Sequence, residues 1–176
     1  RKHQGKGSIV QLSSREIGIL SVSGTTSAVG NRDLKTRIIN KPVLIPWPVD
    51  FMFPLSELEK ESGCIYMERL RLLDGVPIFY DISFIANINL PRITARQFEN
   101  RSLFRILREH YNIEIKGGEQ RIRAISPTSK ISRFLKLAKG QPVLHLERKM
   151  ETNVNGLYLY SSIFCNTGKY SIFGRF

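Results

Sequence analysis

The sequence has few cysteines, few acidic residues and no long apolar run among its 176 residues. Cys64 and Cys165 lie about 100 residues apart, outside any CxxC pair or Cys/His cluster, which argues against a disulfide framework or a zinc site. No apolar run reaches the ~18 residues of a membrane span. The first residues, RKHQGKGSIV, lack the apolar region of a secretory signal. We therefore expect a cytoplasmic protein that uses no metal, no cofactor and no membrane.

Basic residues are in clear excess instead. Lys and Arg number 27 against 15 Asp and Glu, a formal net charge of +12. Such a charge favours anionic partners. Three interpretations stay open: a soluble basic surface, a basic pocket for a small anion, or a domain that lies beside DNA without recognising its sequence. Five arginines share the stretch 92–108, and no KH, RRM, zinc-finger or homeodomain signature is present. They are Arg92, Arg96, Arg101, Arg105 and Arg108.

The segment 64–86 carries the strongest structural pattern. CIYMERLRLL (64–73) alternates along a strand, so Ile65, Met67, Arg69 and Arg71 share one side. Asp74-Gly75 is typical of a two-residue hairpin turn, and VPIFYDISFIA (76–86) reads as the returning strand.

The rest of the chain alternates short strands and short helices. Charge and isoleucine spacing indicate a helix at 31–40, and the prolines of KPVLIPWPV indicate extended chain after it. Turn residues and apolar spacing predict helices at 51–60, 93–112 and 130–137, and strands at 17–22, 113–125, 141–151, 157–165 and 170–176. Gly117-Gly118 suggests a bulge, and Asn155-Gly156 a type I′ turn. The predicted fold class is α+β, a mostly antiparallel sheet with helices packed against it.

Arg69 and Arg71 are the sharpest candidates for a binding site. Two residues apart on a strand, their side chains project to one face about 7 Å apart, and such a pair can fork onto a phosphate or carboxylate. The alternative is two arginines on the solvated face of a sheet. Asp81 lies across the hairpin and could bind ligand hydroxyls or simply neutralise the arginines. Arg123, near the end of a strand, is a weaker candidate.

Two further groups of residues could line the same pocket. Tyr160 and Tyr170 lie on the last two predicted strands, where an aromatic side chain is equally compatible with the core. The segment SVSGTTSAVG (21–30) could form an anion-binding nest or a solvated loop before a helix. The sequence has no GxSxG, Walker, HExxH or kinase signature, and none of its three histidines is spaced with acids or cysteines as a metal site would be.

Taken in order, several stretches resemble a known family. They are GKGSIV, the Ser/Thr-rich loop, ERLRLLDGVPIFYDISFI, LP, SLFRILREHYNIEI, PVLHLERKMETNVNGLYLYSSIF and KYSIFGRF. Together they resemble the effector-binding (UTRA) domain of HutC-type GntR transcription regulators. The resemblance implies a chorismate-lyase-like fold, a homodimer, and a small anionic metabolite as the partner, in many members a sugar phosphate whose binding releases operator DNA.

The resemblance also implies roles for single residues. Arg69 and Arg71, with the Ser23, Gly24 and Thr25 loop, would hold the anionic group of the ligand. Asp81 takes the place of a glutamate that binds ligand hydroxyls. Leu159 stands where the family has a second glutamate, and only Tyr170 remains of an Arg-Gly-Asp-x-Tyr pattern. These departures leave the identity of the effector open.

The opening QGKGSIV resembles the wing of a winged helix-turn-helix. Residues 1–12 are therefore expected to be a wing remnant, with Lys2 and Lys6 near DNA, and residues 13–176 the UTRA domain; operator DNA would be bound through a domain outside this sequence. We expect a ligand sensor and not an enzyme. The alternatives are a chorismate-lyase-type enzyme with the same fold and a nucleic-acid-binding module.

Overall fold

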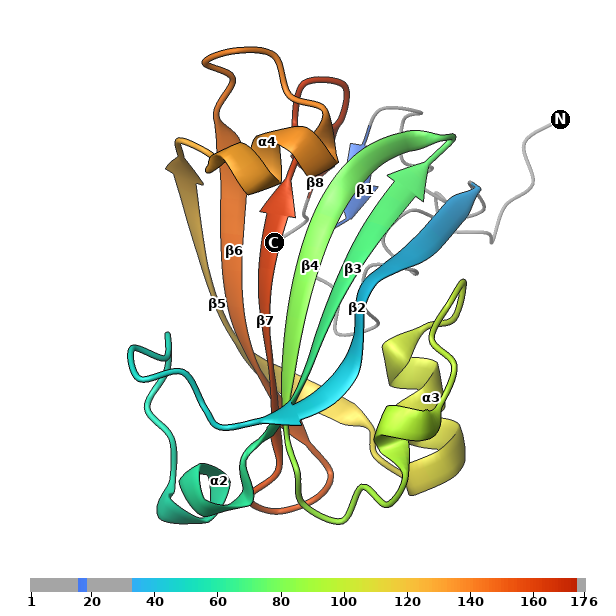
Figure 1. Cartoon of the computed structure of the whole chain (residues 1–176), viewed down its shortest axis with the longest axis vertical. Helices are drawn as coiled ribbons and strands as arrows, with labels where there is room; N and C mark the ends of the chain where they lie inside the picture. Colours follow the sequence, from blue (N-terminus) through green and yellow to red (C-terminus); the bar gives the residue numbers. More distant parts are fainter. Residues whose placement is uncertain (1–15, 19–32, 174–176) are drawn as a thin grey trace, which may run out of the picture.

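A six-stranded sheet forms the centre of the computed structural model, which describes residues 16–18 and 33–173 (Figure 1). The strand order is β2-β3-β4-β7-β6-β5, and every neighbouring pair is antiparallel. This confirms the predicted fold class. The bounds are β2 (Leu34–Ile45), β3 (Cys64–Leu73), β4 (Val76–Ala86), β5 (Ile115–Ile125), β6 (Val143–Thr152) and β7 (Tyr158–Cys165).

The hairpin β3–β4 forms as its sequence predicts. Asp74 and Gly75 both have positive φ, 51° and 78°, which is the backbone of a type I′ turn and suits the twist of the two strands. The register places Arg69 opposite Asp81. The hairpin thereby brings a cation and an anion together in the middle of the sheet.

In the described part of the chain, four short helical segments connect the strands: α2 (Glu57–Ser62), the 3₁₀ turn η1 (Ile93–Ala95), α3 (Leu103–Tyr111) and α4 (Ser129–Leu135). Side chains cap the three α-helices at their N-termini, as their sequences favour. Ser56 accepts from Glu59 N in a capping box, Ser102 accepts from Arg105 N, and Thr128 accepts from Ile131 N.

Two helix predictions are wrong in the same region of space. Residues 34–40 form the first part of strand β2, and only 103–111 of the predicted helix 93–112 is α-helical. One contact accounts for both. Asn100 adopts a left-handed φ of 52°, its Oδ1 accepts from Thr36 N at 2.9 Å, and its own N–H donates to Thr36 O at 3.1 Å. This long-range pairing engages backbone groups that a helix would otherwise use, and residues 34–45 also pair with β3.

The predicted type I′ turn at Asn155-Gly156 is also wrong. Gly156 has a positive φ of 75°, but Asn155 is not among the positive-φ residues, whereas a type I′ turn needs both. Residues 153–157 form a longer connection in which Thr152 Oγ1 donates to Leu157 O at 2.9 Å. A bulge lies next to the position predicted for it: the register shifts between Ile115 and Gly117, so the extra residue is Lys116, while Gly117 and Gly118 pair regularly with Glu151 and Met150.

A small parallel pair lies apart from the main sheet: β1 (Glu16–Gly18) with β8 (Ser171–Phe173). Of the strand predicted at 17–22, residues 19–22 lie outside the described residues. Within the described part of the chain, no helix is both long and apolar enough to span a membrane.

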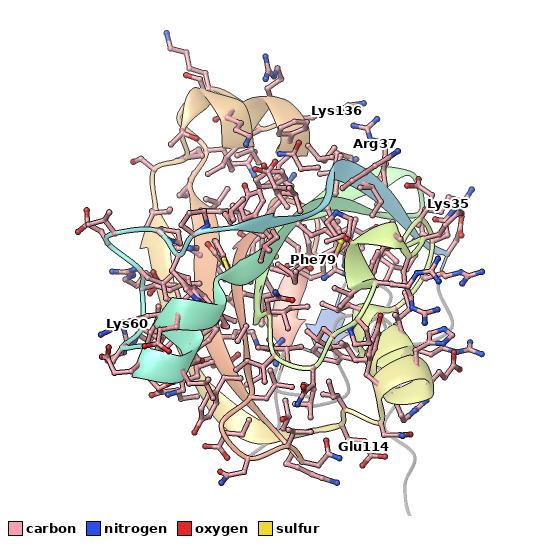
Figure 2. The ribbon with its side chains drawn as sticks, turned by 60° about the horizontal axis from the view of Figure 1, so that its bottom comes forward. Lys35, Arg37, Lys60, Phe79, Glu114 and Lys136 are labelled. Carbon is pink, nitrogen blue, oxygen red and sulfur yellow. The ribbon has the colours of Figure 1, made fainter. Side chains whose placement is uncertain are left out.

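The helices cover opposite faces of the main sheet. Helix α3 packs its buried face, Leu103, Ile106 and Leu107, against Met67 and Met150. On the other face, α4 packs Ile131 and Leu135 against side chains that include Tyr80 and Phe164, and Phe53 beside α2 contacts Phe84 and Tyr160. Figure 2 shows Phe79 in the interior and Lys35, Arg37 and Lys136 at the outside of the molecule.

Candidate functional site

A cluster of charged side chains lies buried on the α3 face of the main sheet. Arg69 and Arg71 come from β3 and Asp81 from β4, and each is only 3% exposed. Arg148 on β6 and Ser161 on β7 lie opposite each other in the register. The strands place all five on one face by alternation, since neighbouring residues such as Glu68 and Tyr80 point to the other face.

The cluster is held together by Asp81. Arg69 Nη2 donates to Asp81 Oδ2 and also to Ser83 Oγ at 3.2 Å. Arg71 Nε lies 3.7 Å from the same carboxylate oxygen, and Ser83 Oγ donates to Asp81 Oδ1 at 3.3 Å. One carboxylate therefore serves two guanidinium groups. Of the two roles left open for Asp81, the ion pair with the arginines across the hairpin is present.

Positive charge exceeds negative charge in this cluster. Burial, followed by the charge of Arg69, lowers the pKa of Arg71 to about 9, although Asp81 opposes the shift. Burial also lowers the pKa of Arg148, again against Asp81. Arg69 Nε, Arg69 Nη1 and Ser161 Oγ are buried without a hydrogen-bond partner among the described residues. Unmet donors and surplus cationic charge both favour an anion at this place.

The cluster lines a small cavity of about 20 Å³. The strands supply Arg69, Arg71, Asp81 and Arg148, and the first turn of α3, residues 102–104, forms part of the wall. That volume holds about one water molecule, whereas metabolite pockets measure roughly 300–1,000 Å³. A metabolite can therefore bind here only when part of the wall moves.

Three other predicted site residues lie in the described part of the chain, and one of them borders the cavity while two do not. Tyr160 borders the cavity, but its ring packs with Phe53 on the opposite face and its hydroxyl donates to Glu59 Oε1 at 2.8 Å. Arg123 pairs with Glu147 at 2.9 Å with its side chain 60% exposed, and it is not among the residues that line the cavity. Tyr170 packs at the edge of a separate apolar cluster and does not line the cavity either.

The remaining predicted residues lie outside the described residues. These are Lys2 and Lys6 of the predicted wing and the loop residues Ser23, Gly24 and Thr25. Their roles stay predictions.

Sequence reasoning missed four polar residues of the cavity: Ser83, Ser102, Arg148 and Ser161. Ser83 could have been found, because it lies two residues after Asp81 on the same strand face. Arg148 and Ser161 required the pairing of β6 with β7, which depends on a register that the turn at 153–157 does not reveal. Ser102 is the N-cap of α3 and also lines the cavity.

A second buried network lies on the opposite face of β3. Tyr66 and Tyr80 hydroxyls donate to the Glu68 carboxylate, and Lys130 Nζ of α4 binds it at 2.9 Å. Burial alone would raise the pKa of Glu68, but the hydrogen bonds from both tyrosines and Lys130 outweigh it, so this pKa is lowered. Glu68 and Arg69 are adjacent, so β3 joins the two networks through the sheet.

The described residues contain no group of three or more His, Cys, Asp or Glu that could hold a metal ion. Cys64 and Cys165 are free and buried, and burial raises the pKa of both thiols to about 12. These thiols are not suited to act as nucleophiles.

Comparisons with known proteins converge on one kind of domain. The UTRA domain family model matches residues 32–171. The "Probable fructoselysine utilization operon transcriptional repressor" of Shigella flexneri is 23% identical over 172 residues, covering 96% of this chain and 69% of the repressor.

Solved structures share the fold at low sequence identity. The effector domain of PhnF from Mycobacterium smegmatis has a TM-score of 0.76 at 11% identity, with 92% of this chain and 98% of that chain covered. A GntR-family transcriptional regulator from Bacillus cereus has a TM-score of 0.61 at 14% identity, with 81% and 98% covered. The fold is chorismate-lyase-like.

Proposed function

Because the chain belongs to the UTRA domain family, the effector domains of GntR-family transcription regulators, we propose that it senses a small anionic metabolite through the cavity beneath α3. The observation that carries this proposal is the charge of the cavity: among the described residues that line it are three arginines, Arg69, Arg71 and Arg148, and one carboxylate, Asp81. A phosphate or carboxylate would complete the charge balance and accept from the unmet donors of Arg69.

The ligand class we propose is a phosphorylated sugar or sugar conjugate. Its phosphate would face the arginines, and Ser83, Ser102 and Ser161, which also line the cavity, would bind hydroxyl groups. The Shigella relative is named for fructoselysine utilisation, so fructoselysine and its phosphate belong among the first compounds to test. Asp81 is committed to Arg69, so hydroxyl recognition by this carboxylate requires the ion pair to rearrange.

Binding has a mechanical consequence in this proposal. The cavity is too small for a metabolite, so a ligand must displace part of its wall, and the first turn of α3 belongs to that wall. The ligand can shift the protein between two states only through a difference in its affinity for them. We propose that this shift reaches operator DNA through a winged helix-turn-helix outside the described residues, in a homodimer.

A thermal-shift screen of the purified chain tests the proposal. The compounds are sugar phosphates, the same sugars without phosphate, amino acids and small carboxylates. A ligand at a hundred times its Kd adds about 2.7 kcal/mol, which raises the Tm of a domain of this size by roughly 5–11 °C.

Two variants locate the binding. Arg69→Met keeps the length of the side chain but removes its charge, and it should abolish the shift. Arg123→Met removes an arginine of the same sheet that lies outside the cavity, so it should leave the shift unchanged. Stabilisation by neutral sugars alone, or equal loss in both variants, would contradict an anionic ligand at this cavity.

A further inference from the structure

A second basic depression lies outside the central cavity, between η1 and α3. It is an open groove of about 570 Å³, lined by three exposed arginines, Arg92, Arg96 and Arg101. Pro91 and the buried side chain of Ile106 contribute an apolar surface to it. A groove of this size falls within the range of metabolite pockets, roughly 300–1,000 Å³.

One of these arginines is held in place before any ligand binds. Arg96 Nε donates to the Tyr111 hydroxyl at 3.1 Å, and its guanidinium carbon lies 5.4 Å from the centre of the Tyr111 ring. Tyr111 in turn donates to Pro91 O at 3.1 Å. This chain of contacts fixes one guanidinium group at the groove and lowers the entropy cost of binding a ligand there.

The charge of the groove has no acidic counterpart. No carboxylate is among the described residues that line it. The two acidic residues in the stretch 92–112 are engaged elsewhere: Glu99 accepts from Ile38 N at 3.0 Å, and Glu109 binds Arg105 at 2.7 Å. Exposed arginines that converge without a carboxylate are suited to bind an oxyanion.

We propose that this groove is a second anion site, which binds the phosphoryl group of a small phosphorylated compound. Arg92, Arg96 and Arg101 contact the phosphoryl oxygens, and the rest of the compound lies against Pro91 and Ile106. The site differs from the central cavity: α3 lines the cavity with residues 102–104 and the groove with Ile106 and His110. Because both sites share α3, a ligand that favours one position of this helix changes affinity at the other.

The test is a titration of the ¹⁵N-labelled chain with inorganic pyrophosphate, followed by NMR at constant ionic strength. We expect saturable shifts centred on the amides of residues 91–101 and 106–110 and on Arg96 Nε. Binding should weaken as salt is added, because the arginines are exposed. Shifts at the strands of the central cavity are a separate set, so the groove is scored whether or not the cavity binds.

Matched variants distinguish a site from general surface charge. The double variant R92Q/R101Q should weaken pyrophosphate binding about tenfold or more. R108Q removes an exposed arginine of α3 that does not line the groove, and it should change the affinity by less than about twofold. Well-dispersed spectra of both variants show that they fold.

Three results would overturn the proposal: shifts spread over the basic surface without saturation, an equal loss of affinity in R108Q, or binding that occurs with a short DNA duplex and not with pyrophosphate. The last result would assign the groove to the nucleic-acid backbone.

Discussion

Replacing Asp81 with asparagine tests the charge balance of the central cavity directly. The substitution keeps the size of the side chain but removes the one carboxylate among the described residues that line the cavity. Arg69 loses the acceptor of its charged hydrogen bond, and Arg71 loses the carboxylate oxygen 3.7 Å away. The variant therefore removes the carboxylate that the structure pairs with the buried guanidinium of Arg69.

The structure gives the size of the effect. Asp81, Arg69 and Arg71 are each 3% exposed, so solvent screens their interactions little. Removing one partner of such a buried pair costs about 3–5 kcal/mol, against a total stability of about 5–15 kcal/mol for a typical domain. For a domain of this length the Tm should fall by roughly 6–20 °C.

The assay is thermal and urea unfolding with phosphate or chloride at matched ionic strength. Asp74→Asn is the control, because Asp74 is exposed in the turn of the same hairpin and Asn-Gly suits a type I′ turn. Phosphate should stabilise Asp81→Asn more than the control, since it can replace the lost negative charge. If Asp81→Asn unfolds within about 1 kcal/mol of the wild type, or if phosphate stabilises both variants equally, the reasoning fails.

Three further predictions concern other parts of the molecule. Cys64 and Cys165 should react with a thiol reagent far more slowly in the folded chain than in urea. Burial raises the pKa of both thiols from 9.0 to about 12. The stability that the buried thiols contribute below pH 9 should therefore be lost as the pH rises toward 12. Because the pKa of Glu68 is lowered, the wild type should lose stability as the pH falls through and below 4.5, and E68Q should lose less in acid titrations of unfolding. Gly118→Ala should cost about 1–3 kcal/mol in urea unfolding, because its Cβ would lie 2.2 Å from a backbone oxygen of β6 at a φ of 144°, whereas Gly117→Ala should cost less.

The sequence predicts correctly those parts of the fold that depend on residues close together in the chain. The alternation of 64–73 and the Asp74-Gly75 turn are sufficient to place Arg69 opposite Asp81, and the structure confirms this register. The predicted helix at 31–40 failed because tertiary pairing overrode local preference. Its backbone joins β3 on one edge, and Thr36 pairs with Asn100 from a distant segment.

The residues of the candidate site also divide into those that a local pattern finds and those that depend on strand pairing. Arg69, Arg71 and Asp81 belong to one hairpin, so a local pattern finds them together. Arg148 comes from β6, which reaches the cavity only through β7 and its pairing with β4. No residue near Arg148 in the sequence signals that contact. The exposed Arg123 fits the same alternating pattern but lies on the edge strand β5, outside the cavity.

If a metabolite binds in the central cavity, as we propose, the small size of this cavity also determines how fast the protein can respond to the ligand. A metabolite enters only after the wall has moved, so its association rate cannot exceed the rate at which the cavity opens. It leaves through the same opening, so a bound ligand is retained for as long as the wall stays closed. Leu103, Ile106 and Leu107 anchor α3 on the sheet at no more than 3% exposure. In the proposed function these residues would control the response time of the sensor as well as the stability of the fold.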